Sequence, residues 1–176
     1  MNVTQKISTL ILGSFLLGCS HSFDRTVKNV ELDRFMGSWY VQAGRFTAFE
    51  KDPFNAIETY TWNEKEDRID IDFRYNKGDF DGELKKMPQK AWIYNTDTNA
   101  HWKVRPFWPL SFSYLIIALD PNYEWTAIGV PNEKYLWIMS RNPHMTKAKT
   151  DEILSVLEKM GYAVNDIEYV KHSKKK

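Results

Sequence analysis

Between Trp39 and Ser140, apolar and polar residues alternate with a period of two, which is the pattern of a β-strand with one buried face. The clearest example is the run 69–73, in which Ile or Phe alternates with Asp. Stretches rich in Asn, Asp, Gly and Pro separate most of these runs and are typical of turns. The pattern predicts eight strands, at 39–43, 56–62, 69–73, 91–94, 101–105, 113–119, 125–130 and 135–140.

The period changes to that of a helix after the eighth strand. Residues 146–160 carry an apolar stripe opposite Lys and Glu, and Gly161 follows as a typical helix end. Residues 166–170 are compatible with a last short strand. Eight consecutive antiparallel strands with short connections lose their open edges if they close on themselves. We therefore expect an all-β fold, an eight-stranded up-and-down antiparallel barrel with one C-terminal α-helix packed outside and a short final strand, in one domain.

An uncharged, largely apolar run at 7–18 follows the polar N-terminus. It is shorter than the ~20 residues of a membrane-spanning helix and has the length of a signal-peptide core, with a buried N-terminal helix as the alternative. The stretch Leu16-Leu17-Gly18-Cys19 resembles the cleavage site of bacterial lipoprotein signals, although Leu17 is bulkier than the small residue usual there. The resemblance implies cleavage before Cys19, diacylglycerol on its sulfur and an acyl chain such as palmitate on its α-amine. An ordinary signal peptide with a leftover cysteine is the other interpretation.

These features predict how the chain is divided. Residues 1–18 form the signal peptide, 19–29 a tether, 30–170 the barrel domain and 171–176 a basic tail that is most simply solvated. Ser20 resembles the residue that permits sorting of a lipoprotein to the outer membrane. The expected location is therefore the bacterial outer membrane, with the protein held by its lipid and facing the periplasm.

Composition excludes several classes of function. A formal net charge of +1 argues against an electrostatically driven nucleic-acid binder. A single cysteine excludes an intramolecular disulfide and CxxC chemistry, and the four His show no ligand-like spacing, so we expect no metal and no cofactor. The chain contains no G-x-S-x-G, H-E-x-x-H or P-loop motif, and we expect it not to be an enzyme. Aromatic residues make up 15% of the chain, and such side chains also line pockets for apolar ligands.

Three motifs occur in order along the strand region: Gly37-Ser38-Trp39-Tyr40, Leu119-Asp120-Pro121-Asn122-Tyr123 and the run 135–143, which ends in Arg141-Asn142-Pro143. Together they resemble the lipocalin family, specifically the bacterial outer-membrane lipocalins and apolipoprotein D, over roughly residues 30–170. The resemblance implies that Gly37, Trp39 and Arg141 are structural, with Trp39 closing the narrow end of the barrel and Arg141 packing across its ring.

The inward faces follow from Trp39 by period two. In the second strand either Glu58 and Tyr60 or Ile57 and Thr61 face inward, and the resemblance favours Tyr60. In the sixth strand Tyr114, Ile116 and Ala118 form one candidate face, with Leu115 and Ile117 nearly as good. The alternative to a pocket is that the inward side chains simply fill the barrel. The residues expected to contact a ligand are Tyr60, Phe73, Tyr75, Tyr114, Ile116, Tyr135, Trp137 and Met139.

The resemblance implies a membrane-anchored lipid-binding protein that holds a fatty acid or lysophospholipid-like amphiphile for storage, transport or membrane maintenance. A second copy of the chain is a further candidate partner. Arg45 and Lys51 are candidates for contact with a phosphate headgroup. The aromatic segment 105–112 either faces ligand or membrane or is itself a packed loop lid. The alternatives are an enzyme or isomerase that uses Glu58 on a bound lipid, and a filled barrel that binds nothing.

Overall fold

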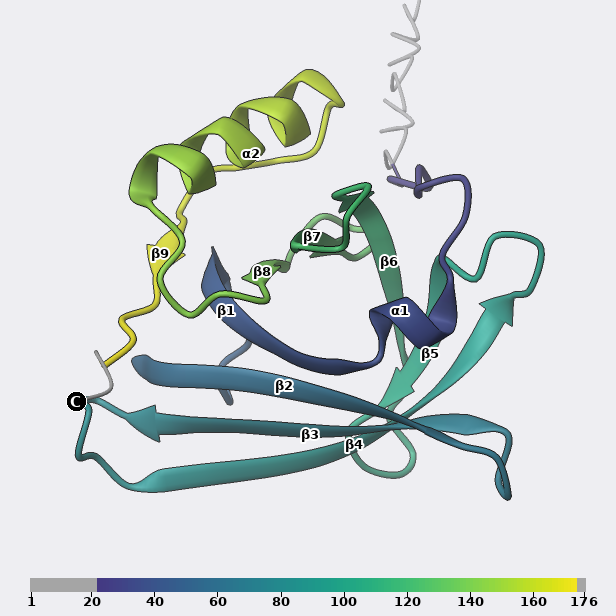
Figure 1. Ribbon diagram of the computed structural model, residues 1–176, viewed down its shortest axis with the longest axis horizontal. Coiled ribbons are helices and arrows are strands. Elements are labelled where there is room, and N and C mark those ends of the chain that lie inside the picture. Colours follow the sequence, from purple (N-terminus) through teal and green to yellow (C-terminus); the bar gives the residue numbers. More distant parts are fainter. Residues whose placement is uncertain (1–21, 174–176) are drawn as a thin grey trace, which may run out of the picture.

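The computed structural model describes residues 22–173, so the signal peptide, Cys19 and the end of the basic tail lie outside the described residues. The described chain forms a sheet of nine strands and two helices (Figure 1). In chain order these are α1 Leu32–Phe35, β1 Gly37–Arg45, β2 Pro53–Asn63, β3 Arg68–Lys77, β4 Leu84–Asn95, β5 His101–Arg105, β6 Phe112–Leu119, β7 Trp125–Gly129, β8 Leu136–Ser140, α2 Lys147–Lys159 and β9 Glu168–Tyr169.

The first eight strands form a closed antiparallel barrel, as predicted. Each strand pairs with the next along the chain, and β1 closes the barrel by pairing with both β8 and β2. The register with β2 covers only Gly37 to Tyr40, so the two strands separate beyond that point. The short strand β9 then pairs with β1 at Ala43 and Gly44. The predicted final strand therefore covers backbone groups that β2 leaves free.

Strand β4 is much longer than the sequence pattern predicts. The predicted strand at 91–94 is only the end of Leu84–Asn95, which pairs with β3 from Ile69↔Ala91 to Asn76↔Leu84. The missed part contains mostly Lys, Gln and Pro, and its side chains alternate between exposed and half-buried rather than between exposed and buried. Without an apolar face to bury, this part of β4 gives no period-two signal.

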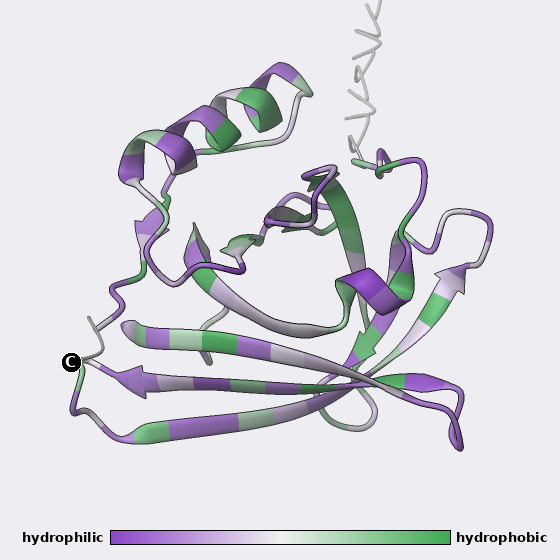
Figure 2. Cartoon of the chain, viewed as in Figure 1, coloured by the Kyte–Doolittle hydropathy of each residue, from purple (hydrophilic) through white to green (hydrophobic). Residues whose placement is uncertain are grey.

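Two apolar cores flank β6. One lies inside the barrel, and the other lies between the barrel wall and α2. Tyr114 and Ile116 point into the barrel core, whereas Leu115 and Ile117 belong to the outer core. Figure 2 shows the consequence, since β6 is hydrophobic along most of its length while β2 to β4 are mainly hydrophilic. Ala118 packs in the outer core and not in the barrel as the face with Tyr114 and Ile116 predicted, because the β6–β7 register shifts between Ile116 and Ala118.

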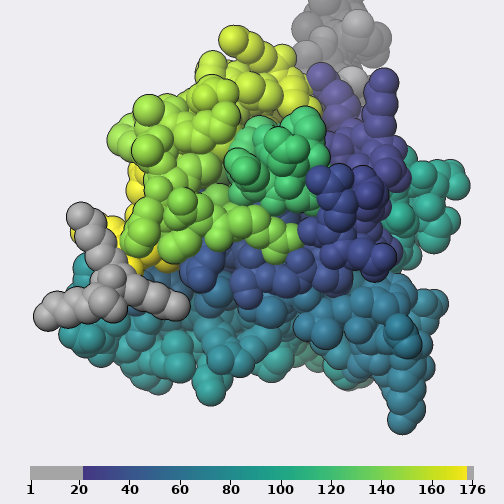
Figure 3. Space-filling model, in the orientation of Figure 1, coloured from purple at the N-terminus to yellow at the C-terminus, as the bar shows by residue number. Residues whose placement is uncertain are grey.

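Helix α2 packs on the outside of the barrel (Figures 1 and 3). The Thr146 hydroxyl caps its N-terminus by accepting a hydrogen bond from the Lys149 N–H, and Ile153 and Leu157 are buried against β6 to β8. Val156, which fits the apolar stripe less well, is 41% exposed. Neither helix in residues 22–173 is long and apolar enough to cross a bilayer.

The two ends of the barrel differ in their connections. We call the end that contains α1 and the turns 64–67, 96–100 and 120–124 the closed end, and the opposite end, with the loops 46–52, 78–83, 106–111 and 130–135, the open end. This division follows from the alternating direction of the strands.

Part of the predicted tether lies against the barrel and runs from one end to the other. The Phe23 N–H donates to the Pro131 carbonyl at the open end (2.7 Å), Val27 N–H to the Ile116 carbonyl on β6 (2.9 Å) and Val30 N–H to the Thr98 carbonyl at the closed end (2.8 Å). Phe23 is buried, with its ring edge-on to Tyr162 at 4.8 Å. The chain therefore enters the barrel domain beside the open end.

Candidate ligand-binding site

Aromatic side chains fill the closed half of the barrel. Phe35 from α1 contacts the rings of Trp39, Tyr60 and Trp102 at centroid distances of 5.1–5.6 Å. Trp102 stacks on Tyr114 with ring centroids 5.1 Å apart. All of these side chains are buried, so this half of the interior is a packed core with little room for a ligand.

Arg141 ties the closed end together. Its guanidinium lies 3.7 Å from the centre of the Trp39 ring and donates to the backbone carbonyls of Ser38, Arg34, Phe35 and Met36 at 2.7–3.0 Å. The Trp39 Nε1–H donates to the Phe35 carbonyl at 2.8 Å. Gly37 has φ +92°, a conformation that L side chains rarely adopt, which explains the glycine at this position. A planar cation with several donors suits the position of Arg141 better than a lysine.

A cavity of about 170 Å³ occupies the open half of the interior. Its floor includes Glu58 and Tyr114, and its mouth lies between the β1–β2 and β5–β6 loops. The mainly apolar wall is typical of a small-molecule site. The residues that line it are Thr47, Ala48, Phe49, Glu50, Glu58, Ile71, Met87, Gln89, Val104, Pro106, Phe107, Leu110, Phe112, Ser113, Tyr114, Val130, Tyr135 and Trp137.

The structure separates the eight expected ligand contacts into two groups. Tyr114, Tyr135 and Trp137 line the cavity. The other five lie in the barrel core without lining it: Tyr60, Phe73, Tyr75, Ile116 and Met139. Period-two reasoning identifies side chains that point inward, but it does not tell which of them border empty space.

Two buried carboxylates face the cavity, and they belong to different elements. Glu50 comes from the β1–β2 loop, and Glu58 lies on β2, where it faces inward together with Tyr60. Each is 6% exposed. Glu50 accepts hydrogen bonds from the Thr47 N–H (2.9 Å) and the Trp137 Nε1–H (3.0 Å). The sequence pattern offers Glu58 as a possible inward residue and as the candidate for an enzymatic role, but it does not identify Glu50, whose loop position carries no periodic signal.

Glu58 has fewer partners than Glu50. It accepts a hydrogen bond from the Tyr60 hydroxyl, which lies 2.6 Å from the Tyr114 hydroxyl. Burial raises the pKa of Glu58 to about 7, while the Tyr60 hydrogen bond lowers it and the nearby Glu50 raises it further. Burial also raises the pKa of Glu50, against the lowering effect of its donors. The cavity floor therefore contains a carboxyl group that titrates near neutral pH.

The open end exposes a group of apolar side chains that we call the rim: Phe49, Phe107, Trp108, Leu110 and Phe112. Trp108 is 81% exposed and Phe49 is 63% exposed. The rings of Phe49 and Phe107 meet edge-on across the mouth at 6.2 Å, and the Phe49 carbonyl accepts a hydrogen bond from the Tyr75 hydroxyl at 2.7 Å. A cluster of exposed apolar side chains of this kind marks an interaction surface rather than ordinary solvated surface.

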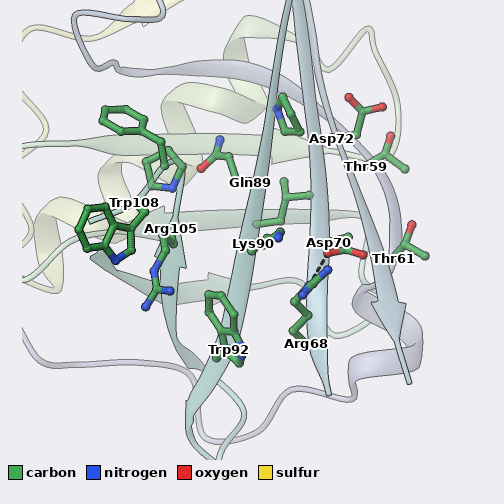
Figure 4. Close-up of a pocket in the computed structure, with 14 residues that line it drawn as sticks. Thr59, Thr61, Arg68, Asp70, Asp72, Gln89, Lys90, Trp92, Arg105 and Trp108 are labelled. Atoms are coloured by element: carbon green, nitrogen blue, oxygen red, sulfur yellow. Dashed lines mark hydrogen bonds and ion pairs between the residues drawn. The ribbon is translucent and has the colours of Figure 1, made fainter. Parts of the chain in front are cut away.

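A larger hollow of about 590 Å³ lies outside the barrel, over β2 to β4 and the β5–β6 loop (Figure 4). Arg68 pairs with Asp70 at 2.7 Å on one side of it, and Arg105 lies 4.9 Å from the centre of the Trp92 ring on the other. More than half of its lining residues are polar or charged. The interior cavity is therefore the better candidate for an apolar ligand.

The two cations suggested for a headgroup lie elsewhere. The Arg45 guanidinium donates to the backbone carbonyls of Lys134, Ala163 and Asn165 at 2.5–3.1 Å, and also to that of Glu133. Lys51 is exposed, and neither side chain lines the cavity. Within residues 22–173, no group of three or more His, Cys, Asp or Glu side chains is arranged to hold a metal ion.

Comparison with known proteins places this barrel in a family. Residues 30–172 match the family model of a lipocalin-like domain. The chain is 30% identical over 165 residues to the outer membrane lipoprotein Blc of Vibrio cholerae, covering 92% of this chain and 95% of the relative. It is 30% identical over 144 residues to Blc of Escherichia coli K12, covering 82% and 80%.

Solved structures agree at the level of the fold. Lobster apocrustacyanin A1 superposes with a TM-score of 0.63 at 11% identity, covering 81% of this chain and 79% of the other. Insecticyanin from the tobacco hornworm Manduca sexta gives a TM-score of 0.63 at 14% identity, covering 85% of each chain. With a closed eight-stranded barrel, a hollow open half and a family model that matches most of its length, the chain belongs to the lipocalin family.

Proposed function

We propose that this lipocalin is anchored to the bacterial outer membrane through Cys19 and binds a single-chain amphiphile, such as a fatty acid or a lysophospholipid, in the cavity of its open half. The role is storage, transport or membrane maintenance rather than catalysis. The observation that carries the proposal is the position of the cavity mouth, because the rim and the incoming N-terminal chain lie at the same end of the barrel. A second copy of the chain as a partner stays a prediction.

The route of the N-terminal chain supports a mouth that faces the membrane. The Phe23 N–H donates a hydrogen bond to the carbonyl of Pro131 in the β7–β8 loop, and Pro131 follows the cavity residue Val130. Cys19 precedes Phe23 by four residues, which span at most ~14 Å when fully extended. An acylated Cys19 would therefore hold the rim close to the bilayer surface, where exposed Phe and Trp side chains are favourable.

The names of the relatives support the same location. The proteins from V. cholerae and E. coli are both outer membrane lipoproteins by name. The lone Cys19 after an apolar run is consistent with a lipoprotein in this chain too. We extend the location, but no particular ligand, from the relatives to this protein.

The size of the cavity bears on how a ligand enters. At about 170 Å³ it is smaller than the ~300–1,000 Å³ of typical ligand pockets. The mouth is bordered by Phe107, Leu110 and Phe112, which lie on or beside the β5–β6 loop and are each at least 38% exposed. Because these side chains are exposed, we infer that the loop moves outward to admit an acyl chain.

Ligand binding is tested with the full chain carrying Cys19→Ser, which cannot be acylated. Lysophospholipid is titrated while Trp fluorescence is followed, and a saturable change is expected because Trp137 lines the cavity. Trp137→Ala should weaken binding, whereas Trp125→Ala, which removes a half-buried Trp outside the cavity, should not. Absence of a saturable change, or equal affinity in both variants, would overturn the proposal.

The orientation is tested with the acylated protein in vesicles whose acyl chains carry bromine, which quenches Trp fluorescence at short range. Trp108→Phe should remove much of the quenched signal because Trp108 lies on the rim. Trp125→Phe, at the start of β7 and thus at the closed end, should leave the quenched signal unchanged. A reversed pattern would place the closed end at the membrane.

A further inference from the structure

The floor of the cavity contains a buried carboxylate with no cation beside it. Glu58 is 6% exposed, lines the cavity, and accepts one hydrogen bond, from the Tyr60 hydroxyl. Among residues 22–173 it takes part in no ion pair and in no other hydrogen bond. An ionised carboxylate held this way in an apolar surround is costly unless it takes up a proton or a positive group joins it.

The groups packed around Glu58 do not supply that positive charge. Its strand neighbours are Trp39 on β1 and Phe73 on β3, neither of which titrates. The titratable groups that face it are Tyr60 on β2, Tyr114 on β6 and Glu50 from the β1–β2 loop. The inward side of β4 presents Lys85, opposite Tyr75 near the open end, but the Lys85 Nζ is 2.6 Å from a carboxylate oxygen of Glu83.

We propose that Glu58 makes the cavity floor a subsite for a positively charged amine, so that the preferred ligand is a single-chain amphiphile with an ammonium group rather than one with a carboxylate. This inference rests on the proposed ligand-binding function and specifies its ligand class. The ammonium enters the cavity, pairs with Glu58 and displaces water, while the alkyl chain lies along the apolar wall toward the mouth. A fatty-acid carboxylate at the same place would face Glu58 and Glu50 with no cation.

Glu50 gives a matched comparison, because it shares the burial and the cavity but has more hydrogen-bond donors around it. The Thr47 N–H and the Trp137 Nε1–H each donate to a different carboxylate oxygen of Glu50. Each of its two oxygens therefore already accepts a hydrogen bond from the protein itself. Removing the charge of Glu50 should affect the loop, whereas removing the charge of Glu58 should affect the choice of ligand.

The preference depends on pH through Glu58 itself. An alkylammonium stays charged from pH 5 to pH 8, so a change in the preference over that range comes from the protein. Because the pKa of Glu58 is about 7, its carboxylate is largely ionised at pH 8 and largely protonated at pH 5. The advantage of an amine over an alcohol of the same chain length should therefore decrease as the pH falls.

The experiment compares decylamine, decanol and decanoate at pH 8, using the full chain with Cys19→Ser and displacement of a fluorescent probe. Wild type should bind decylamine about tenfold more tightly than decanol, as expected for a buried charged hydrogen bond, and decanoate least tightly. Glu58→Gln should remove the difference between decylamine and decanol. Glu124→Gln, which removes an exposed carboxylate at the closed end outside the cavity, should retain it.

The outcomes separate this proposal from the proposed function. If none of the three compounds binds saturably, ligand binding in the cavity is itself wrong. If all three bind equally to wild type, or if Glu58→Gln keeps the amine preference, the subsite is wrong while ligand binding stands. Loss of the preference between pH 8 and pH 5 in wild type supports a carboxylate subsite in the cavity even if Glu58→Gln fails to fold, and a preference independent of pH overturns it.

Discussion

The two ends of this barrel are built from the same eight strands but differ in how their aromatic side chains are packed. At the closed end, Trp39 is fully buried, its Nε1–H donates a hydrogen bond to the Phe35 carbonyl, and the Arg141 guanidinium lies over its ring. At the open end, Trp108 is 81% exposed and the interior beneath the rim is hollow. At the closed end the aromatic rings are buried and the polar groups have partners. At the open end aromatic rings are exposed and, within the described chain, the carboxylate of Glu58 has no cation beside it.

The boundary between the two halves is the layer of hydroxyl groups on Tyr60 and Tyr114. Toward the closed end, the rings of these residues pack on Phe35 and Trp102. Toward the open end, Glu58 accepts the hydrogen bond from Tyr60 and borders the cavity. We therefore expect stability to be concentrated in the closed half, so that the open half can carry features that cost stability, as is common at functional sites.

The largest difference between the two ends is expected when one tryptophan at each end is truncated. Trp39→Ala should lower the free energy of unfolding by about 3–5 kcal/mol, because it removes a fully buried ring and leaves a cavity under Arg141. Trp108→Ala should change it by less than about 0.5 kcal/mol. Urea denaturation of the two variants measures both effects, and similar losses would show that the open end is as tightly packed as the closed end.

The next largest effect is expected from pH and comes from Glu58. Its pKa is about 7 in the folded protein, against an ordinary value of 4.5 in the unfolded chain, so the folded protein binds more protons between these values. Stability should therefore fall as the pH rises from about 4.5 to 7, by about 3 kcal/mol in total for this group, and then stay constant. Urea denaturation as a function of pH measures this fall.

Glu58→Gln isolates the contribution, because Gln does not titrate. The variant should be more stable than wild type at pH 8 and should lose this advantage toward pH 4.5. The raised pKa of Glu50 gives a slope of the same sign in both proteins and cancels in the difference. A difference that does not change with pH would show that Glu58 ionises freely in the folded protein.

A smaller loss of stability is expected at Arg141. Arg141→Lys keeps the positive charge but loses the fork that reaches several backbone carbonyls and covers the indole, so it should cost about 1–3 kcal/mol. The control is Arg34→Lys, since Arg34 also lies over a ring, that of Tyr123 at 4.1 Å, but its side chain is 44% exposed. Thermal or urea unfolding should show at most about 1 kcal/mol there, and an equal loss at both sites would contradict a special role for Arg141.

The difference between the two ends also explains why the closed end can be predicted from the sequence. The closed end is built from side chains that pack, so period two and the Gly37–Tyr40 motif locate Trp39, and the third motif locates Arg141. The outer helix is likewise visible as an apolar stripe. The barrel topology follows from the number of strands and their short connections, which the structure confirms.

The open end is harder to predict because its defining feature is empty space. Phe73 and Tyr75 point inward as expected but stack on each other at 5.5 Å in the core, while Glu50 reaches the cavity from a loop. The first half of β4 has no apolar alternation because two of its inward positions are occupied by Lys85 and Gln89. The inward prediction for Ala118 is wrong because of a register shift that the residue types of β6 and β7 do not indicate.

The smallest change in stability is expected on the mouth loop. Phe107 is 52% exposed and meets Phe49 edge-on at 6.2 Å, so Phe107→Ser should cost less than about 1 kcal/mol in free energy of unfolding. The same substitution should slow the transfer of a fluorescent lysophospholipid from vesicles to the acylated protein, because Phe107 borders the mouth. Phe80→Ser is the matched control, since Phe80 is an exposed aromatic at the open end that meets Phe54 edge-on at 5.1 Å but does not line the cavity. If both variants slow the transfer of lipid equally, general membrane contact rather than the mouth controls entry. If Phe107→Ser lowers the free energy of unfolding as much as Trp39→Ala, the loop belongs to the core.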